Sequence, residues 1–481
     1  MNALPSDLTV MLPELIMALG GMALLLIGVM RGDEQAMGFL SFLAVLVMGA
    51  AAYFVVRPLG SVDTAFAGAF VADGFARFSK ILILLGAALA IVMSQGYFVR
   101  EKIARFEFPV LVVFATLGML LMVSASSFLA LYMGLELQSL ALYVLAAFNR
   151  DSVRSSEAGL KYFVLGALSS GMMLYGISFI YGFTGSTEFG QVALVIKASG
   201  VHPGLIFGIV FLIAGLAFKV GAVPFHMWTP DVYEGSPTPI TAFFAMAPKI
   251  AAMALFLRAV IVPFPDAVEQ WRQIIVVVSV LSMILGAVAA IGQTNIKRLM
   301  AYSSIGHMGY TLLGLAAGST AGVEGVLIYL SVYLVTNAGV FACILAMKRN
   351  GEMVETIGDL SGLARTQPRM ALALAMLMLS LAGIPPLAGF FAKFYVFLAA
   401  IEAHLYAPAI IGVLASVVGA YYYLRIVKIM YFDEPAAPFD RDMGIGLGSI
   451  LAASSAFTLL FVVGAAPLLT LAEFGARALV P

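Results

Sequence analysis

Four charged residues stand out within the long apolar runs of this 481-residue sequence, where charge is costly. They are Glu136, Lys219, Lys249 and Lys393. A charged side chain at the centre of a bilayer costs at least about 2.5–3.5 kcal/mol, so such residues are rare and usually functional. Glutamate and lysine both gain and lose protons, and the chemistry that they indicate together is proton relay.

A buried lysine can act as a proton switch. Desolvation lowers the pKa of a lysine from its ordinary value of about 10.4, and a nearby carboxylate raises that pKa again. Moving the carboxylate away then releases a proton, and returning it recaptures one. Glu136 and Lys219 are the natural pair for this switch, although the sequence does not show that they touch.

Each of the three lysines neighbours an expected interruption of its helix. Lys219 precedes Gly221 by two residues, Lys249 directly follows a proline, and Lys393 comes shortly after Pro385 and its neighbouring proline. Proline removes a backbone hydrogen bond and kinks a helix, which leaves carbonyl groups free for other partners.

Two of these residues also have purely structural interpretations. Glu136 could join two helices by hydrogen bonding, and Lys219 could extend its ammonium group from a helix end to the membrane surface. The cost of a charge in an apolar run weighs against both structural interpretations.

Five further polar residues are candidates for a supporting polar axis. Histidine titrates near neutral pH and can shuttle protons. Glutamate and lysine at i and i+4 on a helix are as typical of a plain surface ion pair as of a functional site. The five residues are His226, Lys297, His307, Glu157 and Lys161.

The elements that must position these residues are membrane-spanning helices. The sequence is 62% hydrophobic and 11% charged, whereas soluble domains carry about 25% charged residues. Its surface must therefore face lipid, and the sequence predicts an all-α integral membrane protein. A spanning helix needs about 20 mostly apolar residues. Fourteen runs qualify: 9–29, 36–56, 74–96, 108–126, 127–148, 157–182, 203–223, 238–261, 273–292, 299–318, 323–347, 369–399, 407–431 and 446–470.

The basic residues predict the orientation of these helices. If the connections alternate between the two sides, one side receives most of the Lys and Arg residues, which places it in the cytoplasm. An even number of helices then puts both termini on the opposite, periplasmic side. The first residues lack the positive charge of a secretory signal, so the first run is expected to be a retained helix.

An internal repeat is the second large-scale pattern. Lys219 and Lys393 are 174 residues apart, close to the 165 residues between two plausible repeat starts near 108 and 273. Five helices per unit is an odd number, so the second copy is inverted, and broken helices in inverted repeats mark transport sites. The expected units are a three-helix segment over 1–106, repeats over 107–262 and 263–431, and a final transmembrane helix within 432–481.

Several kinds of site are not indicated. The single cysteine, Cys343, cannot ligate an iron–sulfur cluster alone, and the four histidines lack metal-ligand spacing. There is no phosphate-binding loop, and the glycines over 444–448 lack the spacing and the preceding strand of a dinucleotide turn. No cofactor or metal site is expected within this chain.

Four sequence blocks resemble one family. They are MGLELQSL at 133–140, AFKVGAVPFHMWTPDVYEGSP at 217–237, QTNIKRLMAYSSIGH at 293–307 and AGIPPLAGF at 382–390. They resemble the antiporter-like subunits of respiratory complex I and of multisubunit cation/proton antiporters, over nearly the whole chain. Lys393 and the short stretch after the last predicted helix favour the type of subunit that has no long lateral C-terminal helix.

This resemblance implies a function. A proton-translocating membrane-arm subunit of NADH–quinone oxidoreductase would relay protons through Glu136, Lys219, Lys249 and Lys393 while quinone is reduced elsewhere. The implied partners are other membrane and peripheral subunits, which hold the flavin and iron–sulfur clusters, together with the bilayer of the bacterial inner membrane and no nucleic acid. The alternatives are a subunit of a multisubunit Na⁺/H⁺ antiporter and a structural scaffold.

Overall fold

The computed structural model describes residues 6–32, 36–57 and 63–480 as a bundle of α-helices. The remaining residues, including the first five, lie outside the described part. Within it, eleven helices are long and apolar enough to cross a membrane. The helices of the first half are α1 (Ser6–Val10), α2 (Leu12–Arg31), α3 (Ala36–Val56), α4 (Gly74–Arg100), α5 (Glu107–Val123), α6 (Phe128–Ala146), α7 (Val153–Thr184), α8 (Phe189–Ser199), α9 (Pro203–Val220), α10 (Trp228–Gly235), α11 (Thr238–Ala245) and α12 (Ala247–Ile261).

The second half continues the bundle without a sheet layer. Two short antiparallel strand pairs lie in the connections between helices. They are β1 (Thr64–Ala65) with β2 (Phe70–Val71) and β3 (Lys348–Arg349) with β4 (Glu352–Met353). The helices are α13 (Val268–Ile291), α14 (Ile296–Ala317), α15 (Thr320–Ala346), α16 (Leu363–Thr366), α17 (Pro368–Ala382), α18 (Ala388–Glu402), α19 (Tyr406–Phe432), α20 (Ile445–Gly464) and α21 (Ala466–Leu479).

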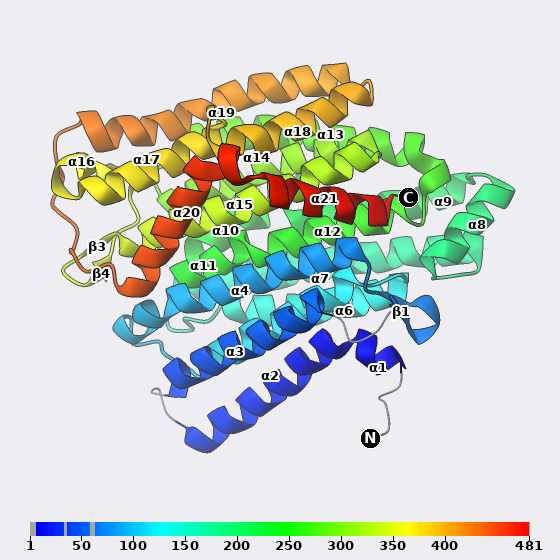
Figure 1. Ribbon diagram of the computed structural model, residues 1–481, viewed down its shortest axis with the longest axis horizontal. Helices are drawn as coiled ribbons and strands as arrows, with labels where there is room; N and C mark the ends of the chain where they lie inside the picture. Colours follow the sequence, from blue (N-terminus) through cyan, green and yellow to red (C-terminus); the bar gives the residue numbers. More distant parts are fainter. Residues whose placement is uncertain (1–5, 33–35, 58–62, 481) are drawn as a thin grey trace.

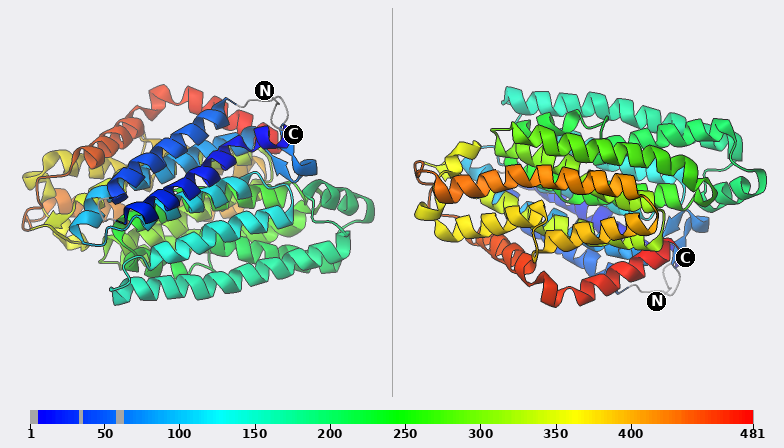
Figure 2. Two further views of the ribbon diagram at one scale, coloured as in Figure 1. Left: turned by 90° about the horizontal axis from the view of Figure 1, so that it is seen from below. Right: turned by 90° about the horizontal axis from the view of Figure 1, so that it is seen from above.

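Most of the long helices run side by side along the longest axis of the molecule (Figures 1 and 2). The short helix α16 and the β3–β4 pair lie at one end of the bundle, where α17 and α20 also begin. We call this the basic end, because it includes Lys348, Arg349, Arg365 and Arg441. Helices α1 and α8 and the end of α21 lie at the opposite end.

Burial separates inner helices from outer ones. In the most apolar stretch of each helix, all residues of the α11–α12 segment and 94% of those of α15 are buried inside the protein. In α20 the buried share is only 28%. A helix that is apolar on every side can lie wholly inside a protein or face lipid. The inner helices therefore form the packed centre, and the outer ones present apolar side chains to the bilayer.

Glycines allow neighbouring helices to approach closely. A Cβ on Gly118 of α5 would lie 2.7 Å from the Gly134 carbonyl oxygen of α6, and a Cβ on Gly286 of α13 would lie 2.5 Å from the Gly306 nitrogen of α14. Small residues at such contacts are typical of helix packing in membranes, where backbone contact replaces the hydrophobic driving force.

Three expected runs are interrupted, and their sequences explain where. α9 ends just before Gly221, whose φ of 75° is left-handed, and α17 ends just before Gly383, whose φ is 88°. Left-handed backbone is easily adopted only by glycine. α11 and α12 are separated by Met246, just before Pro248, whose missing N–H is tolerated only in a first helical turn.

Every one of the fourteen predicted runs contains a helix, and eleven helices of the described residues meet the length and composition criterion for a membrane span. α5 has 17 residues and α17 has 15, so both fall short of the span criterion. The predicted final helix over 446–470 is wrong in detail, because α20 ends at Gly464 and α21 begins at Ala466. Pro467 in the first turn of α21 cannot continue the ladder of α20.

Candidate functional site

Lys219 lies in the last turn of α9 and is buried, with 8% of its surface exposed. Its Nζ donates hydrogen bonds to the Ser139 hydroxyl at 2.9 Å, to Ser170 at 3.4 Å and to Tyr143 at 3.5 Å. The ammonium group therefore points between α6 and α7, and the interpretation that it reaches the membrane surface is wrong.

Glu136 occupies the same helix as Ser139, one turn earlier. Its carboxylate makes no ion pair within 4.0 Å in the described part of the chain, and its Oε1 is buried without a hydrogen-bond partner. Ser139, one helical turn after Glu136, accepts a hydrogen bond from the Lys219 ammonium group. Glu136 and Lys219, the pair expected from the sequence, therefore do not form a direct salt bridge, and Ser139 links their helices.

Lys249 lies in the first turn of α12 and is almost fully buried, at 1% exposure. Its Nζ donates to the Val220 carbonyl oxygen at 2.7 Å, and it lies 5.0 Å from the centre of the Trp228 ring. Val220 is the last residue of α9 and directly follows Lys219. At the end of α9, the Lys249 ammonium therefore bonds to the residue that directly follows Lys219.

Lys393 repeats this arrangement in the second half of the chain. Its Nζ donates to the Ala382 carbonyl oxygen at 2.9 Å, and Ala382 is the last residue of α17 before the break. A second bond of 2.7 Å reaches the Ser416 hydroxyl, and the Tyr310 ring centre lies 5.0 Å away. In both halves a carbonyl group freed by a left-handed glycine accepts a lysine ammonium.

Buried lysines in the described residues fall into two groups. Lys80 and Lys297 form ion pairs with carboxylates, at 2.6 Å with Glu14 and at 2.7 Å with Glu355. The other three donate only to hydroxyl and carbonyl oxygens, and no carboxylate lies within 4.0 Å of their Nζ atoms. They are Lys219, Lys249 and Lys393.

His307 connects hydroxyl groups on both sides of its ring. Nδ1 lies 2.6 Å from the Tyr329 hydroxyl and Nε2 lies 3.0 Å from the Tyr423 hydroxyl, which also contacts Ser303 at 2.5 Å. A neutral imidazole donates at one nitrogen and accepts at the other. A proton received on one side can therefore leave from the other.

Two small cavities border His307. One of about 10 Å³ is lined by His307, Tyr310, Lys393 and Ser416 among others. A second cavity of about 10 Å³ touches His307 from the side of Tyr329 and α15. A cavity needs roughly 10–15 Å³ to hold one water molecule, so each is close to that size. Each is also bordered by polar groups.

Three hydroxyl groups lie between the Lys249 and His307 regions. Tyr233 of α10 lies 5.9 Å, measured from its ring centre, from the Lys249 Nζ. Ser304 of α14 faces both the Tyr233 and the Tyr333 hydroxyls, and none of the three hydroxyls has a hydrogen-bond partner within normal bonding geometry among the described residues. These groups extend the polar axis across the centre of the bundle.

The remaining predicted residues lie nearer the basic end. Lys297 donates to the Ser236 carbonyl oxygen at 3.0 Å as well as pairing with Glu355. His226 lies half-buried in the turn between α9 and α10, and its Nδ1 has no partner in the described residues. Both border the axis without a direct contact to Lys219.

Glu157 and Lys161 form the expected i, i+4 ion pair at 2.7 Å, on an exposed surface. Lys161 also pairs with Asp231 of α10 at 2.7 Å, and Arg298 of α14 pairs with Asp231 at 2.8 Å and with Glu234 at 2.9 Å. These ion pairs join α10 to α7 and to α14, and they fix the position of α10 after the break that follows α9.

The hydroxyl partners of the lysines were not predicted from the sequence. Serine and tyrosine are common in apolar helices, and their pairing with residues 76 or 80 positions away leaves no local signal. Glu355 was missed because it lies outside every predicted run. No group of three potential metal ligands is found in the part of the chain that the structure describes.

Comparisons with known proteins identify the family of the chain. The family described as "NADH:quinone oxidoreductase/Mrp antiporter, TM" matches residues 125–419. NADH-quinone oxidoreductase subunit N of Parvibaculum lavamentivorans is 62% identical over 474 residues, which is 98% of this chain and 97% of the relative. Subunit N 1 of Rhizobium meliloti is 60% identical and covers 99% of both chains.

Solved structures share the fold. A chain of respiratory complex I from Thermus thermophilus with bound aureothin has a TM-score of 0.80 and 33% identity, covering 96% of this chain and 99% of that one. A chain of the Mrp complex from Dietzia sp. has a TM-score of 0.85 at 24% identity over 98% of this chain and 97% of that chain, which supports the fold alone. The chain therefore belongs to the antiporter-like membrane family of NADH:quinone oxidoreductase and Mrp antiporter subunits, and within it to the subunit N group.

Proposed function

We propose that this chain is a proton-translocating membrane-arm subunit of NADH–quinone oxidoreductase and that quinone is reduced elsewhere in the complex. The observation that carries the proposal is the set of three buried lysines without counter-ions, two of which bond to the free carbonyl groups of broken helices. A lysine outside an ion pair can gain or lose a proton without breaking one. The relatives at 55–62% identity are all subunits of this oxidoreductase.

The proposed relay runs through the centre of the bundle. Glu136 and Lys219 exchange a proton by way of Ser139, and Lys219 and Lys249 approach each other at the break in α9. From Lys249 the path crosses the Tyr233, Ser304 and Tyr333 hydroxyls to His307, and it ends at Lys393. The catalytic roles belong to Glu136, Lys219, Lys249 and Lys393, and the supporting roles to His226, Lys297, His307, Glu157 and Lys161.

The proposed architecture has fourteen spans in four units. Residues 1–106 form a three-helix segment, 107–262 and 263–431 form inverted five-helix repeats, and 432–481 contain the last span. Matching glycine contacts between α5 and α6 and between α13 and α14 support the repeat, as do the matching breaks at Gly221 and Gly383. We place the basic end in the cytoplasm and both termini on the periplasmic side of the bacterial inner membrane.

The partners follow from this role. Other membrane and peripheral subunits of the complex surround the chain and hold the flavin and iron–sulfur clusters, and this chain carries no redox centre of its own. The multisubunit Na⁺/H⁺ antiporter is the second candidate, since the Dietzia Mrp chain shares the fold. Sequence identity favours the oxidoreductase subunit over the antiporter subunit, because the Mrp chain is 24% identical to this chain and the subunit N relatives reach 62%.

Purification of the tagged chain from native membranes in mild detergent tests the assignment. We expect the preparation to contain flavin and iron–sulfur signals and to reduce quinone with NADH. A preparation with neither the signals nor the activity, but with cation/proton exchange after reconstitution, would reject the oxidoreductase assignment and support the antiporter.

Gly221→Ala should impair the relay without removing any titratable group. A Cβ at Gly221 would lie 2.7 Å from the Lys249 Nζ, and its φ of 75° is left-handed, which costs a non-glycine residue roughly 1–2 kcal/mol. We expect NADH:quinone turnover per assembled complex to fall about tenfold or more, since a misplacement of about 1 Å can cost on the order of 10²-fold.

Gly171→Ala is the matched control, because a Cβ at Gly171 of α7 would meet nothing within 4 Å. Its turnover should stay close to that of the natural chain. Equal turnover in the two glycine variants would show that the position of the Lys249 ammonium does not matter.

A further inference from the structure

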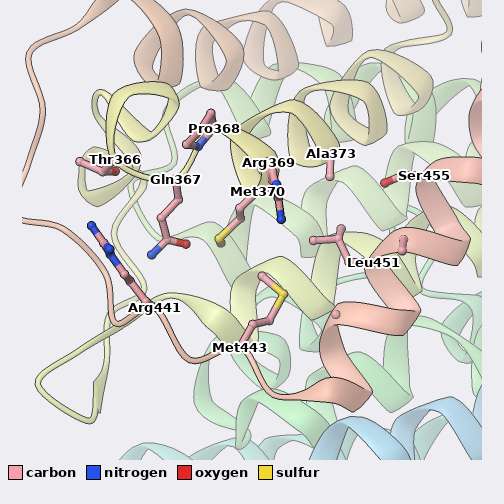
Figure 3. Close-up of a pocket in the computed structure, with 12 residues that line it drawn as sticks. Thr366, Gln367, Pro368, Arg369, Met370, Ala373, Arg441, Met443, Leu451 and Ser455 are labelled. Carbon is pink, nitrogen blue, oxygen red and sulfur yellow. The ribbon is translucent and has the colours of Figure 1, made fainter.

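A groove lies away from the polar axis, at the basic end. It has a volume of about 810 Å³, within the range of about 300–1,000 Å³ typical of small-molecule sites. Its walls come from α16, α17, α20 and the segment that leads into α20 (Figure 3). None of the residues assigned to the proton relay lines it.

Two arginines without partners stand at this groove. Arg369 extends from the first turn of α17 toward α20, and Arg441 extends toward α16 and α17 from the segment before α20 (Figure 3). Both are exposed, and neither makes a hydrogen bond or an ion pair with any described residue. Arg349 at the same end, by contrast, pairs with Asp359 at 3.1 Å.

The nearby carboxylates are already engaged. Asp440 accepts backbone hydrogen bonds from Asn350 at 3.1 Å and from Gly351 at 2.9 Å. Asp442 accepts one from Gly444 at 3.0 Å. Neither carboxylate forms an ion pair with Arg369 or Arg441 among the described residues, so both guanidinium groups can bind an anion from outside.

The backbone adds to the attraction for an anion. α17 has 15 residues and α20 has 20, and no side chain caps the N-terminus of either. Free N–H groups and the helix dipole favour negative charge at such ends. Both helices begin at the groove, and Pro368 and Gly448 from their first turns line it.

Apart from the arginines, the groove is lined by the polar residues Thr366, Gln367 and Ser455 and by a larger apolar set. The apolar set along α17 and α20 includes Met370, Ala373, Leu451 and Ala452. The inorganic phosphate ion would use only the two arginines and would leave this wall exposed to water. A ligand that has an anionic head and a hydrocarbon chain matches both parts.

We propose that this groove binds an anionic phospholipid from the leaflet at the basic end. The phosphate of its headgroup pairs with Arg369 and Arg441, because guanidinium groups bind phosphate through paired N–H donors. One acyl chain lies along Met370, Ala373 and Leu451. The bound lipid fills the space between α17 and α20, next to the broken helix that carries Lys393.

Photolabelling of the detergent-purified complex tests this site. The complex is washed free of native lipid and exposed to phosphatidylglycerol that carries a diazirine in its acyl chain. We expect labelled peptides from 366–373 and 443–455, with labelling reduced by unlabelled phosphatidylglycerol but not by phosphatidylcholine or inorganic phosphate. Arg369→Gln with Arg441→Gln should weaken binding about thirty-fold, at about 1 kcal/mol per basic residue.

Arg365→Gln is the matched control, since Arg365 lies at the same end without lining the groove, and it should label like the natural chain. Three results would overturn the proposal. These are competition by phosphatidylcholine as strong as by phosphatidylglycerol, competition by inorganic phosphate alone, and absence of label because a partner subunit covers the groove. The competition arms use the natural chain, so they decide the matter even if the double variant does not assemble.

Discussion

Lys219→Ala should lower NADH:quinone turnover at least about tenfold, because positioned proton-transfer groups typically contribute about 10²–10⁴-fold. The variant removes an ammonium group that bonds to Ser139, Ser170 and Tyr143 at 2.9–3.5 Å. It leaves the backbone of α9 and its break unchanged. Turnover is measured in the purified complex and divided by its flavin content, so that a loss of assembly is not counted as a loss of activity.

Lys197→Ala is the matched control for this experiment. Lys197 is exposed on α8 at the opposite end from the basic end and lies off the polar axis. Its variant should turn over at the natural rate. If Lys219→Ala also kept more than half of that rate, a role for Lys219 in the rate-limiting relay would be excluded, and the scaffold interpretation would gain support.

Glu14→Ala should destabilise the chain by about 3–5 kcal/mol, the usual cost of leaving one charge of a buried ion pair alone. The Glu14 carboxylate lies 2.6 Å from the Lys80 Nζ, and both side chains are at most 3% exposed. Within the described residues, this lysine is the only charged partner of Glu14. The measurement is the temperature at which half of the chain is lost from the heated, detergent-solubilised complex.

Two further variants separate lost charge pairing from lost packing. Glu14→Leu combined with Lys80→Met should recover most of the stability, since apolar residues of similar volume often replace a buried pair without loss. Glu473→Ala breaks the exposed Glu473–Arg477 pair of α21 and should cost at most about 1 kcal/mol. Similar losses for Glu14→Ala and Glu473→Ala would contradict the account of the buried pair.

The sequence predicted the helices well because the bilayer imposes a length and a hydropathy that are visible in one chain. It also predicted the breaks near Lys219 and Lys393, since glycine and proline act locally on the backbone. α21 was joined wrongly to α20, because both are apolar and the bend at Ala465 changes the direction of the chain without interrupting its hydropathy.

The pairing of polar groups could not be predicted in the same way. Glu14 and Lys80 lie inside two predicted helices, yet their ion pair joins residues 66 positions apart. Ser416 was not singled out because only the packing of α19 beside α18 brings its hydroxyl to Lys393. Such contacts depend on which helices become neighbours, and a single sequence holds no direct record of that.

The rate of proton transport by the complex in lipid vesicles tests the central claim, that Lys219, Lys249 and Lys393 lie on one path. Each single Lys→Ala variant should reduce NADH-driven acidification per assembled complex at least about tenfold. Combining any two should cause little further loss, because steps in series are blocked by either one. Single variants that keep more than half of the flux, or losses that multiply when variants are combined, would contradict a single proton path through these three lysines.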